Sequence, residues 1–110
     1  MVLIGIYIIG CGYMYFQQEG LLFHPEKLKA SHQFQFENKF EERTIGGKIN
    51  PLSAVLFKAS EEKSEKVVFY LHGNSGNIQT SGDVTKSYTD LGYDVFVFDY
   101  RGFGKSKGEI

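Results

Sequence analysis

The stretch that decides the fold is Val67–Asn77, VVFYLHGNSGN. A short apolar run, Val67–Leu71, ends in His72 and a glycine-rich turn, and a segment with helical spacing follows. This order predicts a strand, a tight turn and the start of a helix. Backbone N–H groups then gather at one open end of a sheet, where the helix dipole helps them hold an oxygen that carries negative charge. We therefore place the candidate site in this turn.

The residues after the turn predict a parallel strand–helix–strand unit. Gly92 stands where a helix would stop, Asp94–Tyr100 is a second apolar strand, and Arg101–Gly108 is a second glycine-rich loop. The helix between the strands is indicated by large or apolar side chains at Ile78, Val84, Tyr88 and Leu91. Such a unit, about 35 residues long, is right-handed and has parallel strands. Apolar runs this continuous indicate strands that are covered on both faces.

The residues before the turn predict an antiparallel hairpin. Apolar and polar residues alternate from Phe34 and Phe36 onward, and the turn signal Gly46–Gly47 separates this region from a second strand, Leu52–Lys58. Ala59–Lys66 then reads as a charged, exposed loop. We therefore predict an α/β fold in which an antiparallel hairpin precedes the parallel βαβ unit.

A hydrophobic helix is expected ahead of this sheet. Val2–Phe16 contains fifteen residues without a charged or amide side chain, which as a helix would be ~23 Å long against a hydrocarbon core of ~30 Å. We expect a single membrane anchor, whose true start could lie upstream of Met1. A secretory signal, a lipoprotein signal ending at Cys11, and a buried hydrophobic N-terminus are the alternatives.

The domain boundaries follow from these patterns. Residues 1–18 form the anchor or signal-like helix, residues 19–41 a connector, and residues 42–110 an incomplete α/β domain. Pro25 biases His24 toward an extended backbone, so we expect connector and no further helix around Leu21 and Leu22.

Composition excludes several classes of protein. The 110 residues suffice for one modest domain, and 42% hydrophobic residues indicate a packed core. A net charge of -1 shows no footprint for nucleic acid. The single cysteine, Cys11, excludes an intrachain disulfide. His24 and His32 are spaced neither as a zinc pair nor along one helix face, and no metal site is predicted.

Three motif-like matches fail on context. Gly104–Gly108 reads literally as G-x-S-x-G, but its Ser106 does not follow directly on a strand as a nucleophile elbow requires. A phosphate loop would need glycine at Asp99, and a dinucleotide fingerprint would need glycine at Lys107. What remains is a pair of loops at the C-terminal ends of two adjacent parallel strands, where ligands bind in open α/β sheets.

At this point the chain resembles the α/β-hydrolase superfamily, and particularly its membrane-anchored serine-hydrolase branch related to the Bem46 proteins. The resemblance rests on four stretches in a fixed order, which are Leu21–Leu28 (LLFHPEKL), Tyr70–Asn77 (YLHGNSGN), Leu91–Val95 (LGYDV) and Asp99–Glu109 (DYRGFGKSKGE). It implies hydrolysis of an ester, thioester or amide through an acyl-serine, on a small acyl substrate, with no metal or organic cofactor.

The resemblance also implies roles for the turn. The backbone N–H of Asn74 would form half of an oxyanion hole, a donor worth ~3–4 kcal/mol of barrier. His72 would anchor the loop without acting as the catalytic base, and Gly73 and Gly76 would allow close backbone approach. Asp99 and Arg101 are expected to bond across loops.

In this family the nucleophilic serine and its acid and histidine come after the fifth strand, beyond Ile110. We therefore expect an N-terminal portion of a longer hydrolase, or a natural truncation, that is inactive by itself. The family's strand order, 1-2-4-3-5, would leave Val67–Leu71 as an exposed apolar edge. The alternatives are a nucleotide-binding α/β module, and a non-catalytic anchored interaction protein.

Overall fold

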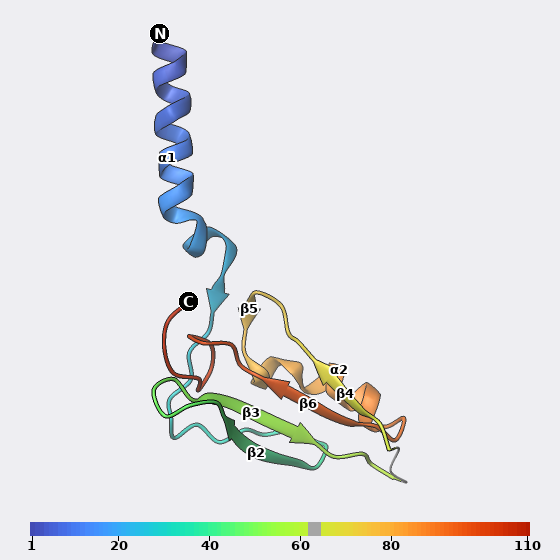
Figure 1. Ribbon diagram of the computed structural model, residues 1–110. Coiled ribbons are helices and arrows are strands. Elements are labelled where there is room, and N and C mark those ends of the chain that lie inside the picture. The colour runs from blue at the N-terminus through green and yellow to red at the C-terminus, as the bar shows by residue number, and fades with distance from the viewer. Residues whose placement is uncertain (62–64) are drawn as a thin grey trace.

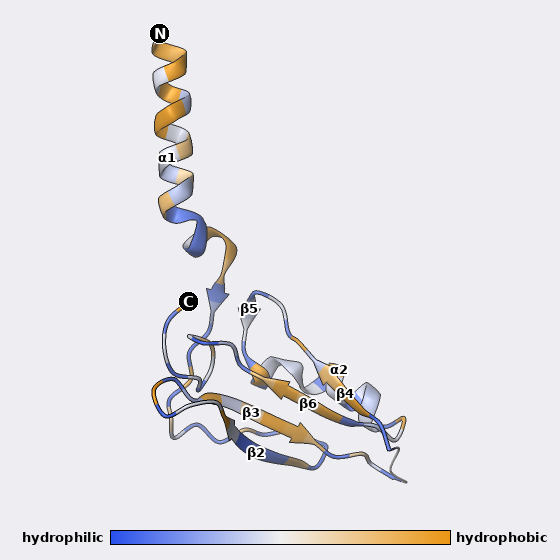
Figure 2. Ribbon diagram, in the orientation of Figure 1, coloured by the Kyte–Doolittle hydropathy of each residue, from blue (hydrophilic) through white to orange (hydrophobic). Residues whose placement is uncertain are grey.

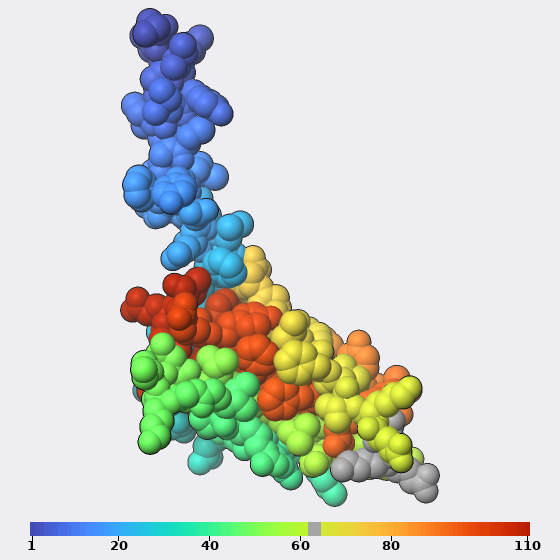
Figure 3. Space-filling model, in the orientation of Figure 1, coloured from blue at the N-terminus to red at the C-terminus, as the bar shows by residue number. Residues whose placement is uncertain are grey.

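The computed structural model describes residues 1–61 and 65–110. Part of the expected charged loop, residues 62–64, lies outside the described residues. A long helix, α1 (Val2–Leu22), stands away from a body built on a β-sheet (Figure 1). The chain is therefore elongated, with a longest dimension of 68 Å (Figure 3).

The body is organised around a four-stranded mixed sheet. Its strands, in spatial order, are β2 (Phe40–Ile45), β3 (Leu52–Phe57), β6 (Asp94–Phe98) and β4 (Val67–Tyr70). β2 and β3 form an antiparallel hairpin, β3 and β6 are also antiparallel, and β6 and β4 are parallel. The predicted hairpin, the parallel pair and the strand order 1-2-4-3 are all confirmed.

One face of the sheet carries the hydrophobic core. Val55 and Phe57 of β3 lie on this face, and their partners on β6 are Val97 and Val95. Phe34 and Ile78 pack against these four side chains, and all six are buried. Ile78 begins a 3₁₀ turn, η1 (Ile78–Ser81), which leads into α2 (Gly82–Thr89). The βα connection therefore covers this face.

The first strand of the hairpin begins later than the alternation at Phe34 and Phe36 predicts. Strand pairing starts only at Phe40, and residues 34–37 belong to no helix or strand. Phe36 lies against Phe57 with ring centroids 4.7 Å apart. Phe34 and Phe36 alternate with polar residues because both side chains pack on the core, although their segment is not paired with another strand.

Of the side chains predicted to form the apolar face of the helix, only Ile78 is buried, and the prediction is wrong for the others. Val84 and Tyr88 are exposed, and Leu91 is 73% exposed. The buried positions of α2 are Thr85 and Thr89. Their hydroxyls bond main-chain carbonyls one turn back, Thr85 to Gly82 and Thr89 to Lys86, so these small side chains can be buried without an unpaired polar group. The stop at Gly92 is confirmed, with φ +91°.

The two edges of the sheet differ in character (Figure 2). β2 exposes the charged side chains between Phe40 and Ile45, a common protection of an edge strand. β4 is the other edge, and alternate side chains, Val67, Phe69 and Leu71, are exposed. The prediction of an exposed apolar edge is confirmed. The prediction that this strand is covered on both faces is wrong.

α1 stands away from the sheet, and only its last turn meets the described body, where Asn74 Nδ2 donates to Leu22 O (Figure 1). None of its residues is buried, so the alternative of a buried hydrophobic N-terminus is wrong. The helix also runs through Glu19–Leu22, where we expected connector. Glutamate and leucine favour helix, and the Phe23 N–H bonds Glu19 O at 2.9 Å beyond the last turn.

Within the described part of the chain, no helix is at once long enough and apolar enough to cross a membrane.

Candidate functional site

The two glycine-rich loops lie side by side at the C-terminal ends of the parallel strands β4 and β6. The first, residues 71–77, contains the short strand β5 (Ser75–Gly76). The second, residues 99–108, follows β6. A third segment joins them, because β1 (His24–Pro25) pairs in parallel with β5. The candidate site is therefore built from three stretches that are far apart in the sequence.

A buried pair of His72 and Asp99 joins the two loops. His72 Nε2 lies 3.0 Å from Asp99 Oδ1, and the two residues are 7% and 0% exposed. The same Oδ1 accepts the main-chain N–H of Ile78 at 2.9 Å, which fixes the start of η1. Asp99 thus bonds across loops as expected, and His72 is held in place rather than free in a cleft.

The hydrogen bonds around His72 favour its charged form. Nδ1 lies 2.9 Å from Gly73 O, and a carbonyl can only accept, so Nδ1 carries a proton. An ionised Asp99 can likewise only accept from Nε2. Burial by itself lowers the pKa of His72, but the bonds to Asp99 and Gly73 and the charge of Asp99 outweigh it and raise the pKa above its ordinary value. Such an imidazolium has no free nitrogen to act as a general base.

Gly104 allows this carboxylate to be buried. Asp99 Oδ2 is buried and has no hydrogen-bond partner among the described residues. A Cβ on Gly104 would lie 1.9 Å from this oxygen, and Gly104 has φ +51°. Close packing of the glycine and its left-handed backbone both exclude a side chain at this position.

Tyr100 adds a second tie between the loops. Its hydroxyl donates to the carbonyl oxygen of His72, and the two rings are 4.4 Å apart between centroids. Burial, with the neighbouring Tyr70 and Asp99, raises the pKa of Tyr100. The phenol therefore stays protonated and remains a donor over a wide pH range.

Ser106 has a structural position. It is buried, its Oγ donates to Asp99 O at 2.6 Å, and the same Oγ accepts the Ser53 N–H at 2.9 Å. The hydroxyl joins the second loop to the start of β3 and has no exposed face from which to attack a substrate. The expectation that this G-x-S-x-G match is no nucleophile elbow is confirmed. Arg101, in contrast, is exposed and makes no hydrogen bond or ion pair to the described residues.

Asn74 is held by two hydrogen bonds, one through its main chain and one through its side chain. Its carbonyl oxygen accepts the His24 N–H at 2.8 Å, and its Nδ2 donates to Leu22 O. Its main-chain N–H bonds no residue that the structure describes. An exposed residue held at two points thus presents one free main-chain donor at the end of the sheet.

The two glycines of the first loop differ in what the fold requires of them. Gly76 has φ +77°, and a Cβ there would lie 3.0 Å from Thr80 Oγ1. A Cβ on Gly73 would meet nothing within 4 Å in the described structure, and Gly73 lacks a positive φ. Gly76 is therefore needed for the turn itself, whereas Gly73 leaves open space next to Asn74.

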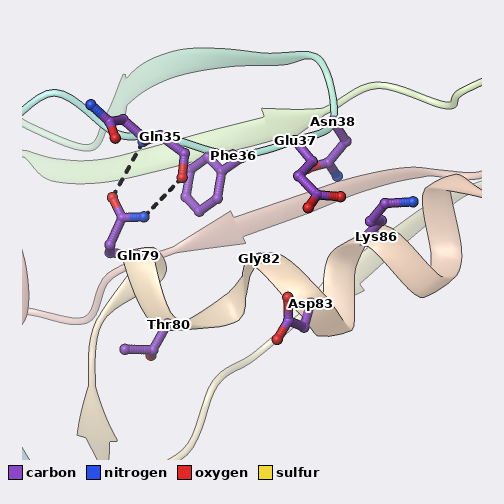
Figure 4. Close-up of a pocket in the computed structure, with 9 residues that line it drawn as sticks. All are labelled: Gln35, Phe36, Glu37, Asn38, Gln79, Thr80, Gly82, Asp83 and Lys86. Carbon is purple, nitrogen blue, oxygen red and sulfur yellow. Dashed lines mark hydrogen bonds between the residues drawn. The ribbon is translucent and has the colours of Figure 1, made fainter.

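A pocket of about 280 Å³ lies elsewhere, between residues 35–38 and the η1–α2 segment (Figure 4). Gln79 closes one end of it through hydrogen bonds with the main chain of Gln35. None of its lining residues belongs to the two loops. Across the described ranges, no three histidine, cysteine or acidic side chains gather as a metal site would require.

Comparison with known proteins gives a consistent result. A model of the family described as serine aminopeptidase, S33, matches residues 62–110. Protein bem46 of Schizosaccharomyces pombe is 25% identical, over 98% of this chain and 39% of its own length. The lysophosphatidylserine lipase ABHD12 of Xenopus tropicalis is 34% identical, over 76% of this chain and 25% of its own. The chain belongs to the α/β-hydrolase superfamily. Its relatives place it in the Bem46-like branch.

A solved structure agrees with this assignment at the level of the fold. A probable hydrolytic enzyme from Pseudomonas aeruginosa superposes with a TM-score of 0.52 at 21% identity, over 78% of this chain and 27% of that one. The chain thus spans less than half the length of each of these three proteins.

The sequence predicted the two loops and a bond from Asp99 across them, but not the partner of Asp99. His72, Gly73, Asn74 and Gly76 lie together in the first loop, as predicted. The pairing of His72 with Asp99 and the packing of Gly104 on that carboxylate were not foreseen. A signal was present, because Asp99 and Gly104 both fall in the loop that follows β6. In an α/β-hydrolase sheet this loop lies beside the one after β4.

Proposed function

We propose that this chain supplies the oxyanion-hole half of a serine hydrolase that cleaves an ester, thioester or amide through an acyl-serine. The observation that carries the proposal is the free main-chain N–H of Asn74, a residue whose carbonyl oxygen and side-chain Nδ2 are both hydrogen-bonded. A tetrahedral intermediate needs donors that are already oriented when negative charge develops. The open space at Gly73 leaves room for a substrate next to this donor.

The supporting groups keep the donor in place. The buried pair of His72 and Asp99, and the Tyr100 hydroxyl on His72 O, fix the start of the loop. His72 acts as an anchor in this proposal, because both its nitrogens are engaged. Because the His72 imidazolium is buried and paired with Asp99, it offers no free positive charge to a nucleotide phosphate, which disfavours the alternative that the loops bind one.

The test begins with the 110 residues themselves. We expect neither turnover of p-nitrophenyl acyl esters nor labelling by a fluorophosphonate probe. In the coding sequence, we expect an open frame past Ile110 with a G-x-S-x-G motif about 40 residues on, judged from the length of a βα repeat. A stop codon directly after Ile110, with stable expression of the chain, would contradict the proposal and favour a non-catalytic interaction protein.

The role of Asn74 can be separated from that of its side chain. In a protein expressed from the longer frame, Asn74→Ala keeps the main-chain donor, so kcat should change by only a few-fold. Asn74→Pro removes the N–H and should lower kcat by roughly 10²–10³. Equal losses in the two variants would contradict a main-chain donor at this residue.

We also propose that the apolar part of α1, residues 2–16, attaches the chain to a membrane. Its side chains are exposed on all sides, and Phe16, at its end, is 83% exposed. Burying such a surface in lipid is favourable. Flotation with phosphatidylcholine vesicles tests this. The double variant Ile8→Asp/Ile9→Asp should lose binding, whereas Gln17→Asp/Gln18→Asp adds the same charge beyond the apolar run and should keep it. Equal flotation of both would contradict the proposal.

A further inference from the structure

The segment that follows α1 is hydrogen-bonded to the first loop of the candidate site. The His24 N–H donates to Asn74 O at 2.8 Å, and the Glu26 N–H donates to Gly76 O at 3.2 Å. These bonds continue the parallel β1–β5 pairing, in which His24 faces Ser75. The connector therefore forms part of the sheet structure around Asn74 and is no loose linker.

The same segment is bonded to the second loop. The Leu28 N–H donates to Gly104 O at 2.9 Å, and the Gly104 N–H donates to Glu26 O at 3.0 Å. Lys27 and Gly104 form an isolated parallel bridge. Residues 24–28 thus lie between the two loops and pair with both.

One atom of this segment bonds both loops at once. The carbonyl oxygen of Glu26 accepts the Gly104 N–H at 3.0 Å and the Asn77 Nδ2 at 3.1 Å. Asn77 is buried, and its Oδ1 caps η1 by accepting the Gln79 N–H at 2.9 Å. The side chain of Asn77 therefore binds the connector with its nitrogen and η1 with its oxygen.

The joint between this segment and α1 is short. α1 ends at Leu22 and β1 begins at His24, so Phe23 alone separates them. Asn74 Nδ2 bonds the carbonyl of Leu22, the last residue of the helix. Only one residue outside helix and strand therefore separates α1 from the segment that bonds both loops.

From these contacts we propose that residues 24–28 act as a clamp that positions both loops of the candidate site and couples their order to α1. Glu26, through its carbonyl oxygen, and Asn77 are positioning residues in this clamp. The inference rests on the proposed function for the role of the Asn74 loop and for membrane attachment, but the clamp itself is defined by the hydrogen bonds alone.

Amide hydrogen exchange of the full chain, followed residue by residue by NMR, tests the clamp. Asn77→Asp keeps the oxygen that caps η1 but replaces the donor to Glu26 O by an oxygen that repels it. We expect exchange of the Gly104 N–H, in the other loop, to become roughly tenfold faster. Asn50→Asp makes the same change at an exposed residue and should leave Gly104 unchanged. Unchanged exchange at Gly104 in a folded Asn77→Asp variant overturns the clamp.

A second variant covers the case in which Asn77→Asp fails to fold. Asn74→Ala, at an exposed position, removes only the bond to Leu22 O. It should accelerate exchange at Gly104 by at least about threefold, on the scale of one hydrogen bond. No effect of this variant on Gly104 overturns the coupling to α1.

Phosphatidylcholine vesicles provide a readout that a merely structural role would not move. If vesicles slow exchange in α1, they should also slow it at Gly104, and Asn77→Asp should abolish the second effect while keeping the first. Protection of α1 without any change at Gly104 overturns the coupling. A lack of protection in α1 counts instead against membrane attachment, and the coupling is then decided by Asn74→Ala.

Discussion

The His72 imidazole donates from Nε2 to Asp99 Oδ1 at 3.0 Å, across the ends of two parallel strands. The residues are separated by 27 positions in the sequence and are both buried. This pair holds the loop that presents the Asn74 N–H. The stability of the loop therefore depends on the charge of one histidine.

Stability should fall as the pH rises through the pKa of His72. That pKa is raised in the folded chain, so the stabilising contribution is complete below the ordinary histidine value of about 6.5 and is lost above the folded value. We expect a lower free energy of unfolding in urea at about pH 9 than at about pH 6. His72→Gln should lose this difference, and His24→Gln, at an exposed histidine, should keep it. The same pH dependence in both variants would exclude His72 as its source.

Gly104→Ala should destabilise the chain by at least about 2 kcal/mol, because it adds a clash with Asp99 Oδ2 to the strain of a positive φ. Gly47→Ala is the matched control, since a Cβ there meets nothing within 4 Å of the described structure. Thermal unfolding of the two variants measures the difference. Similar melting temperatures would show that the loop relaxes around the new methyl group.

Phe57→Ala should cost about 3–5 kcal/mol, the usual price of truncating a buried phenylalanine. Phe57 is fully buried and lies against Phe36. Phe16→Ala is the same chemical change in α1, at a side chain that contacts no core residue, and should leave the unfolding of the body unchanged. Urea denaturation monitored by circular dichroism separates the two. A small effect of Phe57→Ala would argue against the core described above.

Phe69→Thr should reduce self-association of the chain. Phe69 is 59% exposed on the edge strand β4, where unpaired backbone groups and apolar side chains favour pairing with another copy. Static light scattering at rising concentration measures the effect. Leu91→Thr removes a more exposed side chain that lies outside β4, and it should have little influence. An equal reduction in both variants would point to general hydrophobicity instead of the edge.

Ser106→Ala should destabilise the chain by about 1–3 kcal/mol, because the Ser53 N–H loses its partner. It should not alter labelling by a fluorophosphonate, since the buried hydroxyl of Ser106 is not expected to react. Ester turnover by the wild-type chain that disappears in Ser106→Ala would reverse this assignment.

The parts of the fold that the sequence predicted are those set by turns and by continuous apolar runs. Gly46 and Gly47 marked the hairpin, and Gly92 marked the end of the helix before β6. The errors arose where apolar spacing was read without knowledge of the packing. Phe34 and Phe36 alternate because both enter the core, and Leu91 fits a helical face but lies beyond the end of α2.

The candidate site was predicted as far as its main-chain layout. A turn after an apolar strand indicates where N–H groups gather, and this led to Asn74. Contacts between the loops depend on the relative placement of two strands. The pairing of His72 with Asp99, and the role of Glu26 O between Asn77 and Gly104, could therefore not be read from spacing alone.

The packing of Gly104 on the Asp99 carboxylate has a consequence for how such sequences diverge. A side chain fits at position 104 only if Asp99 is replaced by a smaller residue without a carboxylate. His72 then loses its counter-charge. The residue that is tolerated at each of these three positions therefore depends on the residues at the other two. Substitutions at residues 72, 99 and 104 should occur together among homologous chains, even though only residues 72 and 99 share a hydrogen bond.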